Sequence, residues 1–196
     1  MFIIIVLIAF FVVVWLFGLV SKSIQKDRDE KVFNMEASLN KFSDFPSTQR
    51  FDAVDSIITI NENLSQIAIA YKDYAFRYNF SDLVESEILQ DNTSITKTSR
   101  GSQVGGALVG GVLAGGLGAV IGGLSGTQTS NTIIKSLSLR IIVDDLNKPV
   151  HIINFLQNNN QKSNYPCVKE AIDNIQHWHS IMSVIINRNE KKVGEG

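Results

Sequence analysis

The chain opens with a long apolar run and then changes to short periodic segments. Residues 2–20 contain no charged side chain and are rich in Ile, Val and Phe. As a helix with a rise of 1.5 Å per residue, this run would be about 28 Å long, close to the roughly 30 Å hydrocarbon core of a bilayer. No basic residue precedes the run, and it is longer than the roughly 7–15 apolar residues of a signal peptide. We therefore predict an uncleaved transmembrane anchor over residues 1–20.

Basic residues flank only one end of this run. Lys22, Lys26, Arg28 and Lys31 follow it directly. Because positive residues near a membrane span stay on the cytoplasmic side, we expect a single-pass protein of the inner membrane. Its N-terminus would lie outside the cell, and the rest of the chain would be cytoplasmic.

A juxtamembrane helix and linker are predicted over residues 21–50. Apolar side chains recur there at helical spacings, with charged residues between them. Pro46 removes a backbone donor and disfavours helix before it, so the helix should end ahead of that residue.

From Phe51 onward the hydrophobic period changes to two, which is typical of strands. Turn residues such as Asn61-Glu62-Asn63 and Lys72-Asp73 separate the alternating segments. The strand candidates are 55–61, 64–71, 74–80, 81–92, 95–97, 137–143 and 150–156. Together they predict a curved antiparallel sheet of about seven strands.

One amphipathic helix is predicted after the last strand, beginning near Pro166, which suits a first helical turn. Its apolar residues recur at i, i+3, i+4 and i+7 for five turns. They are Val168, Ala171, Ile172, Ile175, Trp178, Met182, Ile185 and Ile186. This face should cap the sheet, giving an α+β domain over residues 51–187, followed by a polar tail over residues 188–196.

A glycine-rich insertion interrupts the strands at residues 101–126. Small residues four apart let helices approach closely, as in membrane helix packing. Three structures are possible: a second membrane span, a helical hairpin or a flexible loop. A single crossing would separate strands that need one another, so we favour the hairpin. The candidate residues for membrane contact or self-association are Gly106, Gly110, Gly111, Gly115, Gly118, Gly122 and Gly126.

The run GALVGGVLAGGLGAVIGG, set between two groups of strands, resembles a family of uncharacterised bacterial proteins. These combine a pleckstrin-homology-like (PH-like, or GRAM-like) domain with a glycine-zipper insertion. The resemblance covers roughly residues 51–187. It implies a seven-stranded sheet with a C-terminal capping helix, and a domain that binds lipids, peptides or proteins and is rarely an enzyme.

The composition and the remaining motifs mainly exclude classes of function. The formal net charge of -1 gives no basic footprint for nucleic acid. The glycine run lacks the Lys-Ser/Thr of a phosphate-binding loop. His177 and His179 point to different sides of a helix, so they cannot share a metal ion. Asp144-Asp145 is predicted to be a turn and Cys167 a buried thiol. We therefore expect no enzyme, no cofactor and no metal.

These observations predict a non-enzymatic, membrane-anchored protein. Its PH-like domain would bind membrane lipid or an unknown protein partner, and its glycine segment would mediate membrane contact or homo-oligomerisation. The alternative is a membrane-perturbing effector, phage-exclusion or toxin-like, in which the glycine segment inserts and oligomerises.

Overall fold

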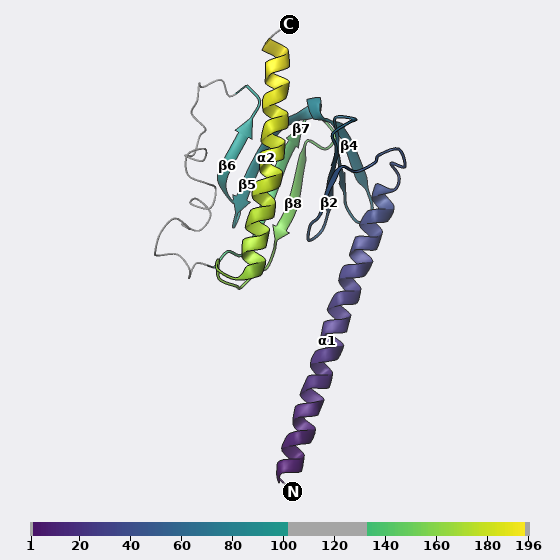
Figure 1. The fold of residues 1–196 in the computed structure, drawn as a ribbon, viewed down its shortest axis with the longest axis vertical. Coiled ribbons are helices and arrows are strands. Elements are labelled where there is room, and N and C mark those ends of the chain that lie inside the picture. Colours follow the sequence, from purple (N-terminus) through teal and green to yellow (C-terminus); the bar gives the residue numbers. More distant parts are fainter. Residues whose placement is uncertain (1, 102–132, 195–196) are drawn as a thin grey trace.

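A computed structural model describes residues 2–101 and 133–194, and it arranges them as two long helices and two sheets (Figure 1). The helices are α1 (Phe2–Leu39) and α2 (Pro166–Gly194), with a short 3-10 helix η1 (Phe80–Asp82). The strands are β1 (Gln49–Asp52), β2 (Ile57–Asn61), β3 (Gln66–Ala70), β4 (Ala75–Asn79), β5 (Leu83–Gln90), β6 (Thr93–Ser99), β7 (Leu137–Val143) and β8 (Val150–Leu156).

The strands form two antiparallel sheets of four, in the orders β1-β2-β3-β4 and β6-β5-β7-β8. The expectation of one sheet of about seven strands is therefore wrong. Each predicted segment contains a strand, but β1 was not predicted. The sheets separate at η1, where a carboxylate oxygen of Asp82 accepts a hydrogen bond of 2.8 Å from the backbone N–H of Asn79. This capped turn redirects the chain, so β4 and β5 join different sheets.

The main core lies between the inner faces of the two sheets and α2. Strand β2 contributes Ile58 and Ile60, and β7 contributes Leu139 and Ile141. Helix α2 packs on β5, β7 and β8. All eight of its predicted apolar residues are buried. The amphipathic pattern thus located the capping helix correctly. The helix continues to Gly194, through most of the predicted polar tail.

Helix α1 covers the outer face of the first sheet with its C-terminal part. Met35 is buried against Ile57 and Ala70, in a cluster separate from the main core. The Ser38 hydroxyl donates a hydrogen bond of 3.1 Å to the carbonyl oxygen of Lys72. Ahead of this docked part, the same helix extends away from the sheets as a stalk (Figure 1).

The anchor and the glycine-rich insertion are the two remaining predicted segments. Among the described residues, no helix combines the length and hydropathy that a membrane crossing requires, so the structure does not support the anchor predicted over residues 1–20. The insertion predicted over residues 101–126 lies outside the described residues from residue 102 onward.

Candidate functional site

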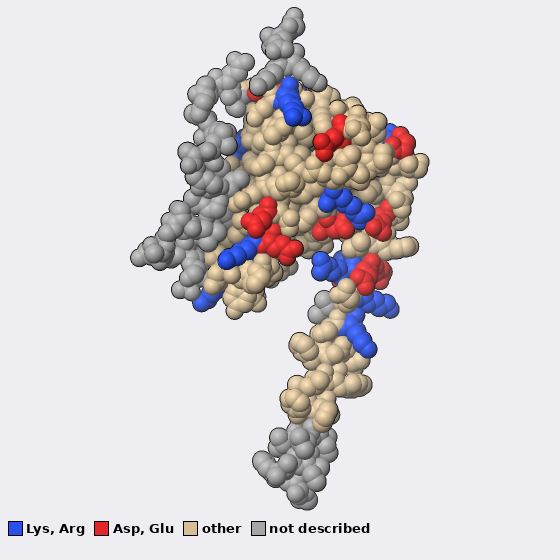
Figure 2. Space-filling view, viewed as in Figure 1, with Lys and Arg blue, Asp and Glu red and all other residues tan. Residues whose placement is uncertain are grey.

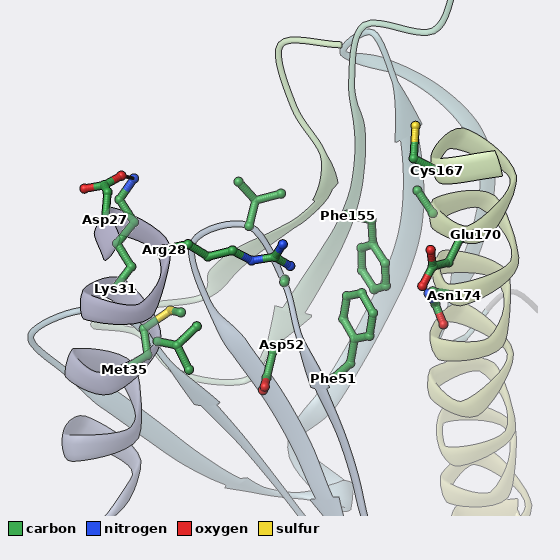
Figure 3. A pocket seen from close by; sticks show the side chains of 14 residues that line it. Asp27, Arg28, Lys31, Met35, Phe51, Asp52, Phe155, Cys167, Glu170 and Asn174 are labelled. Atoms are coloured by element: carbon green, nitrogen blue, oxygen red, sulfur yellow. Dashed lines mark ion pairs between the residues drawn. The ribbon is translucent and has the colours of Figure 1, made fainter. Parts of the chain in front are cut away.

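A groove of about 500 Å³ lies between α1 and the first turns of α2 (Figure 3). One wall is α1, which contributes Arg28, Lys31 and Met35. The opposite wall is α2, which contributes Glu170 and Asn174. The floor is formed by β1, the residues that follow it, and the end of β8. The groove therefore joins two regions that are far apart in sequence, residues 27–54 and residues 155–174.

The floor of the groove is aromatic. Phe51 of β1 and Phe155 of β8 stack with their ring centroids 4.5 Å apart and their planes within 10° (Figure 3). Two hydrogen bonds fix this contact between the sheets. The backbone N–H of Val54 donates to the carbonyl oxygen of Asn154 at 2.9 Å, and Asn154 Nδ2 donates to Asp55 Oδ2 at 2.7 Å. Both bonds join the residues that follow β1 to Asn154, the neighbour of Phe155 in β8.

Charged side chains line the rim of the groove. Lys31 pairs with Asp27 at 2.8 Å, and Asp52 pairs with Arg50 at 2.7 Å. Arg28 and Glu170 differ, because neither forms an ion pair with any residue that the structure describes. Arg28 extends from α1 into the groove, and Glu170 lies on the opposite wall (Figure 3). The rim therefore offers one free cation facing one free anion.

The stalk next to the groove exposes large apolar side chains. Phe10, Phe11, Trp15 and Phe17 are each 63–74% exposed. In Figure 2 this stretch of the stalk carries no charge, whereas blue and red side chains gather where the stalk meets the body. A contiguous apolar surface of this kind marks a contact with a membrane or with another protein.

A buried polar cluster joins the two sheets at another point. His151 of β8 is fully buried, with Nε2 2.9 Å from the hydroxyl of Tyr78 and Nδ1 3.2 Å from that of Tyr71. The Tyr78 hydroxyl donates to Asp145 Oδ2 at 3.2 Å. Burial lowers the pKa of His151 to about 4, and burial raises the pKa of both tyrosines. A neutral imidazole satisfies these contacts, which makes the cluster a structural link.

A second buried histidine ties α2 to the second sheet. His179 Nδ1 lies 2.9 Å from the Ser86 hydroxyl of β5, and burial lowers the pKa of this imidazole to about 4. His177 is exposed, so the two histidines point apart as predicted. Cys167 is exposed at the groove, so the expectation of a buried thiol is wrong. Within the described part of the chain, no cluster of three or more metal-ligating side chains occurs.

The predicted and observed candidate residues do not coincide. Gly106, Gly110, Gly111, Gly115, Gly118, Gly122 and Gly126 all lie outside the described residues. Sequence reasoning used Arg28 only as a marker of orientation, and it gave no role to Phe51, Phe155 or Glu170. The alternation of 150–156 was the one available signal, because it places Phe155 on the same side as the buried Ile153.

Comparisons with known proteins agree with this architecture. The family model described as glycine zipper containing PH domain matches residues 45–157. An immunity protein of Bacillus phage SPbeta is 34% identical over 165 residues, which cover 78% of this chain and 76% of that protein. An SPbeta prophage-derived uncharacterized membrane protein of Bacillus subtilis (strain 168) is also 34% identical over 165 residues, covering 78% of this chain and 67% of the relative. No solved structure matches the chain.

Proposed function

The chain belongs to the family of glycine zipper containing PH domains, and on that premise we propose that it is a non-enzymatic, membrane-attached binding protein that acts in phage immunity. Two relatives support the two parts of this proposal. One is named an immunity protein of a phage, and the other a prophage-derived membrane protein. The proposal assigns both properties to one chain.

The observation that carries the proposal is the continuity of α1. Its first part exposes Phe10, Phe11, Trp15 and Phe17, and its last part is fixed to the first sheet by Met35. A single helix therefore links an apolar surface to a folded domain without a flexible joint. Insertion of the apolar part into a bilayer would remove it from water and hold the domain at the membrane surface.

The orientation and the glycine segment complete the proposal. Lys22, Lys26, Arg28 and Lys31 follow the apolar part, which favours a domain on the cytoplasmic side of the inner membrane. The glycine repeats at 110–111 and 115–116 would mediate membrane contact or self-association, because small residues allow close helix packing.

Membrane attachment is tested by vesicle flotation of the full chain. Replacing Phe10, Phe11, Trp15 and Phe17 together with Ser should abolish co-flotation with liposomes. The matched control is Phe33→Ser, because Phe33 is 70% exposed on the same helix but lies beyond the apolar run. Equal flotation of the quadruple variant and the control would contradict attachment through α1.

The role in immunity is tested by plating phage on bacteria that express the chain. Expression should lower plating efficiency, and substitution of Leu at Gly110, Gly111, Gly115 and Gly116 should restore it. A membrane-potential dye distinguishes the alternative function. Depolarisation that the glycine substitutions abolish would favour a membrane-perturbing effector, whereas protection without depolarisation supports the binding protein. If plating efficiency does not change although the chain is attached to the membrane, the proposed role in immunity is contradicted.

A further inference from the structure

We propose that the groove between α1 and α2 binds one zwitterionic phospholipid, with its phosphate at Arg28 and its ammonium at Glu170. This inference rests on the proposed membrane attachment and names the ligand of the same domain. Its basis is the pair of opposite charges on facing walls, above an aromatic floor (Figure 3).

The free charges of the rim match the two ends of such a headgroup. Lys31 and Asp52 each have a partner, so the groups available to a ligand are the guanidinium of Arg28 and the carboxylate of Glu170. Guanidinium groups bind phosphate through paired hydrogen bonds. A carboxylate on the far wall is suited to an ammonium group. A zwitterion satisfies both groups at once.

The carboxylate of Glu170, which is unpaired among the described residues, argues against an anionic lipid. Lys31 neutralises Asp27, and Arg50 neutralises Asp52, which leaves one positive charge at Arg28 and one negative charge at Glu170. An anionic headgroup without an amine would bring a second negative charge to the Glu170 carboxylate, which Coulomb repulsion disfavours.

The floor supplies the apolar contact that a lipid requires. The stacked rings of Phe51 and Phe155 lie between the two charged walls, where Phe51 is partly exposed and the neighbouring Val54 is 46% exposed. Aromatic faces attract ammonium groups, so the floor also assists Glu170. A water-soluble phosphate compound would use the rim but leave this surface uncovered.

The position of the groove along α1 places it beside the membrane surface. Arg28 follows Val20, the last residue of the apolar run, by eight residues, or about 12 Å of helix. The headgroup layer is roughly 5–8 Å thick on each side of the hydrocarbon core. Arg28 would then lie about 4–7 Å beyond the headgroup layer, a distance that a lipid can cover by rising partly out of the bilayer.

The experiment uses the full chain in nanodiscs of equal parts phosphatidylethanolamine and phosphatidylglycerol, followed by native mass spectrometry of the released protein. We expect one retained lipid, with phosphatidylethanolamine favoured at least fivefold. Glu170→Gln should bring this preference close to one, and Glu170→Lys should invert it. Arg28→Gln should reduce retention of either lipid at least fivefold.

Neighbouring exposed residues provide matched controls. Asp173→Asn lies one turn from Glu170 on α2, and Lys22→Gln lies ahead of Arg28 on α1; neither residue lines the groove. Both variants should keep the wild-type preference. Retention without preference, or an unchanged preference in Glu170→Lys, would overturn the lipid site. Failure of the full chain to enter nanodiscs would instead contradict the proposed membrane attachment.

Discussion

The hydroxyl of Tyr78 in β4 and Nε2 of His151 in β8 lie 2.9 Å apart, and both side chains are buried. They belong to different sheets, and no strand pairing joins β4 to β8. A hydrogen bond between side chains therefore joins these two strands, whereas backbone hydrogen bonds join the strands within each sheet. Because the ring nitrogens of His151 both face tyrosine hydroxyls, the contact orients the second sheet against the first.

Removal of this hydroxyl should destabilise the domain. In Tyr78→Phe, His151 keeps a buried nitrogen without a partner, which costs about 1–3 kcal/mol of unfolding free energy. Urea unfolding of the full chain measures the change. Tyr74→Phe is the control, because Tyr74 is 49% exposed and should stay within about 0.5 kcal/mol of wild type. Equal stability of the two variants would show that the Tyr78–His151 contact contributes nothing.

Acid should weaken the fold before its carboxylates titrate. Burial lowers the pKa of His151 and of His179 to about 4, from an ordinary value of 6.5. Below pH 6.5 the unfolded chain therefore binds protons that the folded chain excludes, and stability falls as the pH drops towards 4. Between pH 7 and pH 5 the loss should be roughly 1–2 kcal/mol for each histidine.

Replacement of a buried histidine tests the origin of this pH dependence. His179→Gln should reduce the slope of stability against pH between 7 and 5, whatever its effect at pH 7. His177→Gln is the matched control, because His177 lies at an exposed position of the same helix. Urea midpoints at pH 7, 6 and 5 provide the comparison, and a wild-type slope in His179→Gln would refute the assignment.

The elements with a strong hydrophobic periodicity could be predicted from the sequence, whereas the groove could not. The pattern of α2 identified both the helix and its buried face. Strand β1 was missed because its four residues, QRFD, are too few to show alternation, and only pairing of Gln49–Asp52 with Ile57–Ile60 makes it a strand. The groove depends on Phe51 meeting Phe155 across more than a hundred residues. No local pattern encodes such a contact.

The ion pairs of the second sheet should differ in strength from those of the stalk. Arg140 of β7 pairs with Glu87 and, at 3.1 Å, with Glu85, and both glutamates are buried. Burial alone would raise the pKa of Glu85, but hydrogen bonds from Lys97 and Ser99 and the charges of Lys97 and Arg140 hold it below its ordinary value. Arg140→Met should therefore cost about 3–5 kcal/mol, because it leaves a buried carboxylate without its partner.

A double-mutant cycle separates the pair from the cost of the stranded charge. Adding Glu87→Gln to Arg140→Met should recover part of the loss in urea unfolding. Lys31→Met is the control, because the Lys31–Asp27 pair is exposed and should contribute less than about 0.5 kcal/mol. Strictly additive effects would show that Arg140 and Glu87 do not interact energetically.

Finally, Met35 should determine whether the stalk is rigid. Its side chain is 2% exposed and fills the contact between α1 and the first sheet, next to Ile57 and Ala70. Met35→Ala leaves a cavity there, a change that costs about 2–5 kcal/mol in protein cores. Because this cluster is separate from the main core, the loss should appear as local opening. Amide exchange over residues 32–39 should then accelerate while α2 keeps its protection. Phe33→Ala, at a residue 70% exposed, should change neither the exchange of residues 32–39 nor that of α2. Global unfolding of Met35→Ala would instead show that α1 and the sheets form one cooperative unit.

Local opening at Met35 would also move one wall of the groove. Met35→Ala should therefore lose the lipid that the wild-type chain retains in nanodiscs, and native mass spectrometry measures this loss. Retention equal to that of the wild type would show that the groove does not depend on the docking of α1.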